Sequence, residues 1–220
     1  MDGGFAEYLT IPERNAVPLE GIPLEPAEIA PLLCPGVARY ASFKLAEAQK
    51  GDKLGLYGFG PTAHCVLKVA QALGIETYVS TRSRKNIERA KREGATWVGN
   101  TAKEVLPCKL DAAVIFPPAG NLVEPALSHV EKGGIVVMAP VNSSKIVIED
   151  YSNNFWGRSL KTLYHVTKSD AEAFLAIVRD LGPEIQVGAS IFPFEGLQDT
   201  LILVKHGKLT KPNAVIQVAA

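Results

Sequence analysis

The chain has 220 residues, enough to bury a substantial core, and its 47% hydrophobic and 21% charged residues are typical of a globular protein. Lysine and arginine together number 23, as do aspartate and glutamate, so the zero net charge gives no support to a nucleic-acid or membrane partner. Three widely spaced cysteines, the lack of a long apolar run and the acidic N-terminus predict a reduced, cytoplasmic protein.

The first part of the chain is predicted to be irregular. Prolines recur along residues 1–30, and the apolar residues there are too few to form a core of their own. We therefore expect this segment to pack on another part of the protein. The apolar spacing over residues 35–49 then predicts a helix, which ends before Gly51.

A glycine turn follows a short apolar run at residue 58. Gly58, Gly60 and Ala63 form the pattern GxGxxA, with Pro61 and Thr62 between the last two. A strand that runs into such a turn and then into a helix offers backbone N–H groups and the positive end of the helix dipole to a pyrophosphate. By itself the pattern is weak evidence, because similar turns occur in many parallel sheets.

Strands and helices alternate regularly after this turn. The remaining predicted strands cover residues 76–81, 96–98, 111–116, 134–139 and 159–164, and the predicted helices cover residues 61–73, 84–93, 121–130 and 170–181. Together with the strand before the glycine turn, these are six strands joined by helical crossovers. The pattern predicts an α/β fold with a doubly wound, parallel, six-stranded Rossmann-like sheet.

The last third of the chain does not fit into that sheet. Its elements are a predicted strand over 187–194, a helix over 195–206 and a strand over 214–218. We expect them to belong, with residues 1–30, to a second unit. The predicted organisation is a segment of residues 1–30, a nucleotide-binding domain of residues 31–182 and a return to the second unit over residues 183–220.

The residues that follow the second predicted strand indicate which dinucleotide the turn would bind. An acid about 20 positions after the glycines would favour NAD, but this region holds hydroxyls and cations and no carboxylate: Ser80, Thr81, Arg82, Ser83, Arg84 and Lys85. Guanidinium and hydroxyl groups match the oxygens of a 2′-phosphate, so the sequence favours NADP. For Arg84 and Lys85 the alternative remains that they solvate the start of a surface helix.

Several segments resemble the zinc-dependent alcohol dehydrogenases of the medium-chain dehydrogenase/reductase superfamily. They are the runs at residues 30–36, 55–60 and 92–96, the N-terminal DGGFAEY, the Lys-Gly-Gly at residues 132–134 and the C-terminal AVIQV. The resemblance implies an NADP-dependent alcohol dehydrogenase or aldehyde reductase, with residues 1–30 and 183–220 as remnants of a GroES-like catalytic domain.

The resemblance also assigns roles to single residues. Cys34 matches the last ligand of the catalytic zinc, whereas the family's first cysteine ligand and His-Glu pair have no counterpart in this sequence. Ala38 stands where many relatives have a threonine that contacts the nicotinamide. The family's remaining cofactor contacts, to the nicotinamide ribose and the carboxamide, fall on Phe116, Pro117, Ala139, Pro140, Tyr164 and His165.

Two functions of different classes follow. The first is an enzyme that passes a hydride between an alcohol or aldehyde and NADP(H), of which this chain alone would be inactive for lack of a complete zinc site. The second is a non-catalytic module for NADPH binding or protein interaction. The resemblance further implies a homodimer, for which we expect residues 143–150 and 160–164 to form the contact.

Overall fold

The computed structural model describes residues 4–211 and 213–218, without the side chains of residues 61 and 62. Its contacts divide the chain into two compact units, one of Val37–Val166 and one of Met1–Gly36 with Thr167–Ala220. No helix in the described part of the chain is both long and apolar enough to cross a membrane.

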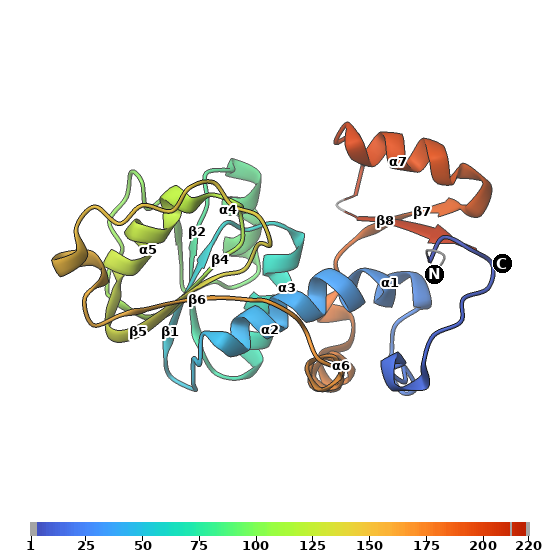
Figure 1. Cartoon of the computed structure of the whole chain (residues 1–220), viewed down its shortest axis with the longest axis horizontal. Coiled ribbons are helices and arrows are strands. Elements are labelled where there is room, and N and C mark those ends of the chain that lie inside the picture. Colours follow the sequence, from blue (N-terminus) through green and yellow to red (C-terminus); the bar gives the residue numbers. More distant parts are fainter. Residues whose placement is uncertain (1–3, 212, 219–220) are drawn as a thin grey trace. The chain divides into compact units, whose positions relative to one another are not determined.

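A parallel sheet in the order β3-β2-β1-β4-β5-β6 forms the centre of the first unit (Figure 1). Its strands are β1 (Lys53–Tyr57), β2 (Glu76–Ser80), β3 (Trp97–Gly99), β4 (Leu110–Ile115), β5 (Val130–Met138) and β6 (Ser159–Thr162). The predicted α/β fold with a doubly wound six-stranded sheet is confirmed. The strand order reverses between β1 and β4, so the carboxyl ends of these two strands flank the position where such sheets bind ligands.

Helices cover both faces of this sheet. They are α2 (Val37–Leu45), α3 (Pro61–Ala72), α4 (Arg84–Arg92) and α5 (Val123–His129), with a 3-10 turn η3 (Gly120–Leu122) and a π-helical turn η4 (Tyr151–Phe155). Figure 1 shows α2 and α3 on one side of the strands and α5 on the other. Burial of apolar side chains on both faces explains the nearly continuous apolar character of the central strands.

The first strand shows how closely the central strands approach one another. Leu54 and Leu56 are fully buried. A Cβ added at Gly55 would lie 2.6 Å from Leu110 Cδ1 and 3.1 Å from Tyr57 Cε2. Gly55 therefore leaves room for core side chains that come from both β1 and β4.

Two strands differ in length from the prediction. The fifth strand begins at Val130 rather than at residue 134, because a register shift between Leu110 and Ala112 allows pairing with β4 to start earlier. The sixth strand ends at Thr162, two residues before Tyr164.

The second unit contains a separate pair of parallel strands, β7 (Ala189–Pro193) and β8 (Asn213–Gln217). Its other elements are η1 (Glu13–Asn15), α1 (Pro26–Pro31), η2 (Leu32–Gly36), α6 (Lys168–Leu181), η5 (Gly182–Ile185), η6 (Phe194–Gly196) and α7 (Leu197–Lys205). In Figure 1, α7 runs alongside the strand pair.

Helical structure begins earlier than predicted. We expected a helix over residues 35–49, whereas helical turns extend from residue 26 to residue 45. Pro26 occupies the first helical turn, and Glu28 accepts the backbone N–H of Glu25 in a capping box. A π-helical turn accommodates Pro35, and the helix ends before Glu47, whose φ is 57°.

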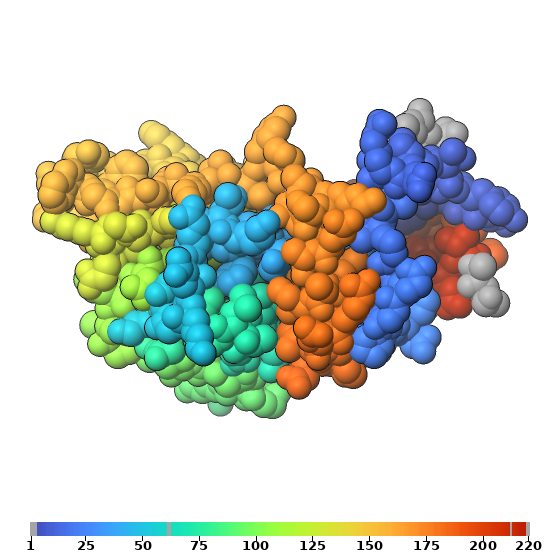
Figure 2. All heavy atoms as spheres, turned by 90° about the horizontal axis from the view of Figure 1, so that it is seen from below, coloured from blue at the N-terminus to red at the C-terminus, as the bar shows by residue number. Residues whose placement is uncertain are grey.

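The helix α6 packs on the N-terminal segment of its own unit. Phe174, Leu175 and Val178 are buried, and a Cβ at Gly36 would lie 2.9 Å from the Phe174 ring. Arg179 Nε donates to the carbonyl of Glu20 at 3.1 Å. Figure 2 shows this helix, in orange, against the blue N-terminal residues.

A tyrosine–histidine pair lies in the core of the first unit. The Tyr57 hydroxyl and His129 Nδ1 are 2.7 Å apart, and the rings stack at 6.2 Å. Burial raises the pKa of the Tyr57 phenol, so its O–H donates to the histidine. Burial, together with the charge of Lys109, lowers the pKa of His129. The pair is therefore neutral in the folded protein near neutral pH.

We predict that this pair makes the protein less stable as the pH falls from about 7 toward 5, because an unfolded histidine with a pKa of about 6.5 binds a proton more readily than folded His129 does. Urea unfolding at several pH values measures this effect. The variant His129→Gln should show a flatter pH dependence than the unchanged chain. An equally steep dependence in both proteins would contradict the prediction.

Candidate functional site

The glycine turn connects the ends of three strands. Gly58 has φ of 82°, in the left-handed region, and its N–H donates to the carbonyl of Ser80 at 2.7 Å. A Cβ at this position would lie 2.8 Å from Pro117 Cδ. Both the backbone conformation and the contact from the loop after β4 therefore require glycine here.

Next to the backbone of Gly60, at the start of α3, there is open space. Gly60 is the N-cap residue of this helix, and a Cβ added to it would meet nothing within 4 Å. Pro61 has no N–H, and the N–H groups of Ala63 and His64 point toward the Gly60 carbonyl at 3.1 and 3.4 Å. The side chains of Pro61 and Thr62 lie outside the described residues. An anion here would meet the turn's N–H groups and the positive end of α3.

The third position of the motif is Ala63 in place of a glycine. Ala63 is fully buried. A methyl group is small enough for the close packing of helix and strand that this position requires.

A polar network supports the turn from the side of α4. His64 Nδ1 lies 2.6 Å from Glu93 Oε2, and Arg89 Nε donates to Glu93 Oε1 at 2.7 Å. The Arg89 guanidinium lies 5.9 Å from the ring centroid of Phe59, which is almost fully buried inside the turn. Burial alone would raise the pKa of the Glu93 carboxyl, but hydrogen bonds from His64 and Arg89 outweigh burial and lower that pKa.

Two of the hydroxyls predicted to contact a 2′-phosphate, those of Ser80 and Ser83, have partners within the protein. Ser80 Oγ lies 2.7 Å from Thr101 Oγ1, and Ser83 caps α4 by accepting the N–H of Asn86. Thr81 is buried, and its N–H donates to the carbonyl of Gly99 at 2.8 Å.

The two arginines of this cluster differ. Arg84 pairs with Glu88 one turn along α4, at 3.1 Å, and both side chains are exposed. Arg82 is exposed, and within the described ranges it has neither a hydrogen bond nor an ion pair. Since Gly58 bonds directly to Ser80, Arg82 follows the strand end beside the glycine turn. Arg82, unlike Arg84, is therefore available to a ligand.

The residues expected on the nicotinamide side follow the next two strands. The N–H of Phe116 donates to the carbonyl of Tyr57 at 3.0 Å, and the N–H of Ala139 donates to the carbonyl of Ile115 at 3.0 Å. Their neighbours Pro117 and Pro140 continue each chain away from the sheet. The structure therefore brings both predicted pairs to the carboxyl edge that contains Gly58.

Sequence reasoning missed Arg39, which reaches the same edge from α2. Its Nη1 donates to the carbonyl of Ala139 at 3.3 Å, and its guanidinium carbon lies 5.8 Å from the Phe116 ring centroid. The signal in the sequence was an arginine placed between the apolar residues 37, 38, 40 and 41 of a predicted helix.

Tyr164 and His165 lie beyond the last residue of β6. Tyr164 is 94% exposed. Its ring packs edge to face against the His165 ring, with the two ring centroids 5.3 Å apart. The structure shows no contact of these two side chains with the turn or with the other strand ends in its described part. Their predicted place beside the carboxamide therefore stays a prediction.

Cys34 is exposed in the π-helical turn η2. Across residues 4–211 and 213–218, no group of three or more His, Cys, Asp or Glu side chains could hold a metal ion. Cys34 thus belongs to no such group in this part of the chain.

The other cysteine near the glycine turn, Cys65, is buried in α3. Burial raises the pKa of its thiol to about 12, so it stays protonated and unreactive at neutral pH.

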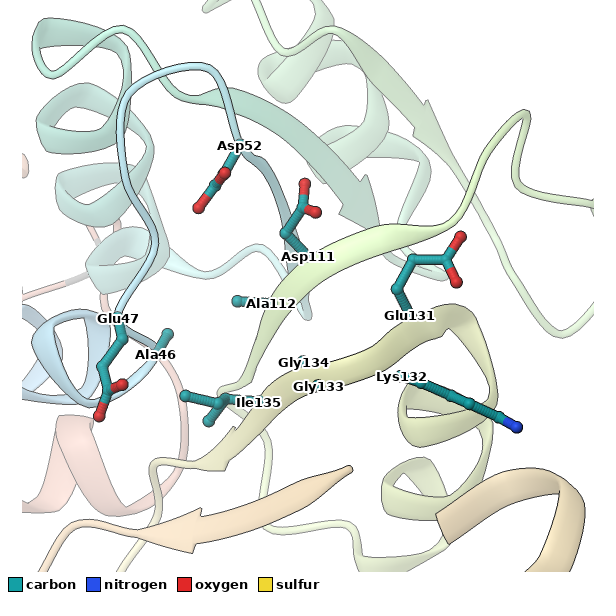
Figure 3. A pocket seen from close by; sticks show the side chains of 10 residues that line it. All are labelled: Ala46, Glu47, Asp52, Asp111, Ala112, Glu131, Lys132, Gly133, Gly134 and Ile135. Carbon is teal, nitrogen blue, oxygen red and sulfur yellow. The ribbon is translucent and has the colours of Figure 1, made fainter. Parts of the chain in front are cut away.

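A cavity of 280 Å³ lies at the opposite, amino-terminal edge of the sheet (Figure 3). Four carboxylates line it, but two of them bind backbone groups: Asp52 accepts the N–H of Gln49, and Asp111 accepts the N–H of Lys53, both at 2.8 Å. Ligands of doubly wound sheets bind at the carboxyl edge instead. We therefore place the candidate cofactor site at the glycine turn and not in this cavity.

Comparison with known proteins finds relatives that cover most of the chain. No family model matches the chain. A probable alcohol dehydrogenase, AdhA, of Mycobacterium tuberculosis is 38% identical over 174 residues, which are 79% of this chain and 50% of that protein. The chain thus spans about half the length of this curated relative.

Two solved structures share the fold. A cinnamyl alcohol dehydrogenase of Sorghum bicolor superposes with a TM-score of 0.73 at 22% identity, over 90% of this chain and 56% of the other. The CAD protein of Helicobacter pylori, complexed with NADP(H), has a TM-score of 0.69 at 20% identity, over 86% and 54% of the two chains.

The identity to AdhA extends over most of the chain, and the sheet, the glycine turn and the fold neighbours agree with it. The chain therefore belongs to the zinc-type alcohol dehydrogenase family of the medium-chain dehydrogenase/reductase superfamily.

Proposed function

We propose that this chain is the NADP(H)-binding portion of an alcohol dehydrogenase or aldehyde reductase. The observation that carries the proposal is the position of Arg82. Within the described residues its side chain has no hydrogen bond or ion pair, and it follows the end of β2. The glycine turn of Gly58 and Gly60 lies beside this strand end. The fold neighbour that contains NADP(H) supports the choice of nucleotide.

The residues present fit both the pyrophosphate and the 2′-phosphate of such a cofactor. The open space at Gly60 lets a pyrophosphate approach the backbone, and Ala63 allows α3 to start close to the sheet. Arg82 would hold the 2′-phosphate by charge-assisted hydrogen bonds, while Thr81, Ser83 and the network around Ser80 shape the strand end. When bound, the reduced nicotinamide would donate a hydride to a carbonyl group, and the oxidised nicotinamide would accept one from an alcohol.

The proposed position of the nicotinamide follows from the topology. A dinucleotide lies across the switch point between β1 and β4. With the adenosine half at the end of β2, the nicotinamide half would lie over the ends of β4 and β5. The nicotinamide ribose would contact the residues that follow these two strands, Phe116, Pro117, Ala139 and Pro140. Tyr164 and His165 would lie near the carboxamide.

We further propose the domain roles. Residues 31–182 would form the nucleotide-binding domain, and residues 1–30 and 183–220 would be parts of a GroES-like catalytic domain. Cys34 would be one ligand of a catalytic zinc, which needs two more protein ligands. Ala38 has no hydroxyl to relay a proton. These 220 residues alone would therefore bind cofactor without turnover.

The second candidate is a module that binds NADPH and catalyses nothing. The same lack of a metal-binding group among the described side chains favours it. The two candidates agree on nucleotide binding and differ in turnover, so one assay separates them. Under either, we propose a cytoplasmic protein.

We predict that Arg82→Gln weakens NADPH binding at least about tenfold and leaves NADH binding nearly unchanged, because a charge-assisted bond to the 2′-phosphate is lost. Titration by intrinsic fluorescence or calorimetry measures both affinities. The control is Lys91→Gln, which removes an exposed charge at the other end of α4. Equal affinity of the unchanged chain for NADH and NADPH would contradict the assignment of the cofactor.

We predict that the purified chain, supplied with zinc, binds less than one zinc ion per chain and reduces no NADP in the presence of alcohols. Plasma emission spectrometry and absorbance at the NADPH band measure the two quantities. The variant Cys34→Ser should not change the zinc content. Stoichiometric zinc with alcohol-dependent turnover would disprove inactivity and favour a complete enzyme.

We propose that two copies pair through the edge strand β6 and residues 143–150. β6 pairs with β5 on one side only, so its other edge has free backbone groups. We predict a dimer in sedimentation equilibrium that Val147→Glu weakens, because this exposed residue would meet its symmetry mate. Val105→Glu, at an exposed loop position away from the proposed contact, is the matched control. A monomer at all concentrations would contradict the pairing.

A further inference from the structure

Arg39 carries a fixed positive charge to the carboxyl ends of β4 and β5. Among its contacts, Nη1 donates to the carbonyl of Ala139 at 3.3 Å, and the guanidinium carbon lies 5.8 Å from the centroid of the Phe116 ring. The side chain is partly buried, so water screens its charge less than that of an exposed arginine. Since a guanidinium stays protonated at every relevant pH, the charge is permanent.

The position of this charge differs from that of Arg82. The sheet order places the end of β2 on one side of the β1/β4 switch point and the ends of β4 and β5 on the other. Under the proposed function, Arg82 meets the adenosine half of the dinucleotide and Arg39 meets the nicotinamide half.

The two redox forms of the cofactor differ in charge at that half only. The oxidised nicotinamide ring is a cation and the dihydronicotinamide ring is neutral, whereas the pyrophosphate and the 2′-phosphate are the same in both. A cation at the ends of β4 and β5 repels the oxidised ring and leaves the reduced ring unaffected. For charges within about 10 Å in a partly buried site, this repulsion changes the affinity roughly tenfold.

We propose that Arg39 makes the site selective for the reduced cofactor. This inference rests on the proposed NADP(H) site and adds its preference between redox states. Such a site binds the hydride donor first and releases the oxidised product readily, which suits the reduction of a carbonyl group.

The test compares the dissociation constants of NADP⁺ and NADPH for the full chain and two variants. In Arg39→Gln, which removes the charge, the ratio of the constant for NADP⁺ to that for NADPH should fall about tenfold. In Arg39→Lys, which keeps the charge, the ratio should stay close to that of the unchanged chain. Arg82→Gln is the control, because it should weaken both forms equally and leave the ratio unchanged.

A purely structural role of Arg39 gives a different result. Loss of its contacts to Ala139 and Phe116 would weaken both forms together, so an unchanged ratio in Arg39→Gln with measurable binding would overturn the inference and leave the proposed function intact. Failure of the unchanged chain to bind either form would overturn the proposed function, and this inference with it.

A second measurement does not depend on any variant. Raising the salt concentration from about 0.05 M to about 1 M should lower the same ratio for the unchanged chain, because salt screens the repulsion between guanidinium and ring. Screening at the phosphates acts equally on both redox forms and cancels in the ratio. A ratio independent of salt would count against Arg39 as its source.

Discussion

The left-handed backbone of Gly58 is the constraint on which the rest of the first unit depends. Its N–H bonds to the end of β2, and its α-carbon lies against Pro117 after β4, so one residue sets the distances between three strand ends. A side chain at this position would strain the backbone and separate β1 from β4. Arg82, Phe116 and Pro117, which are proposed to bind the cofactor, follow these strand ends.

The sheet could be predicted from the sequence because its signals are local. Runs of strand length rich in apolar residues, separated by turn and helix signals, predict the alternation of strands and helices without knowledge of distant contacts. The helix start at residue 26 was missed because the prolines at 12, 18, 23, 26 and 31 suggested an irregular chain. In the structure Pro26 begins the first turn, and a π-helical turn accommodates Pro35.

The site was only partly predictable, for reasons of sequence distance. Arg82 could be found because the spacing from the glycine turn predicts its place at a strand end. The partner of Ser80 is Thr101, and Arg39 bonds to Ala139, one hundred positions away. Such pairs form only when the sheet brings distant segments together, so single-sequence patterns contain no sign of them.

The contact between the ends of α3 and α4 has a consequence for the cost of binding. The side-chain amide of Gln71, in the last turn of α3, donates to the carbonyls of both Glu93 and Gly94 at 3.0 and 2.9 Å. Glu93 in turn bonds to His64 in the first turn of α3, so the two helices are joined along the length of α3. The glycine turn, proposed to bind the pyrophosphate, is thus joined through α3 to the residues that end α4. Little ordering entropy is left to be lost on binding.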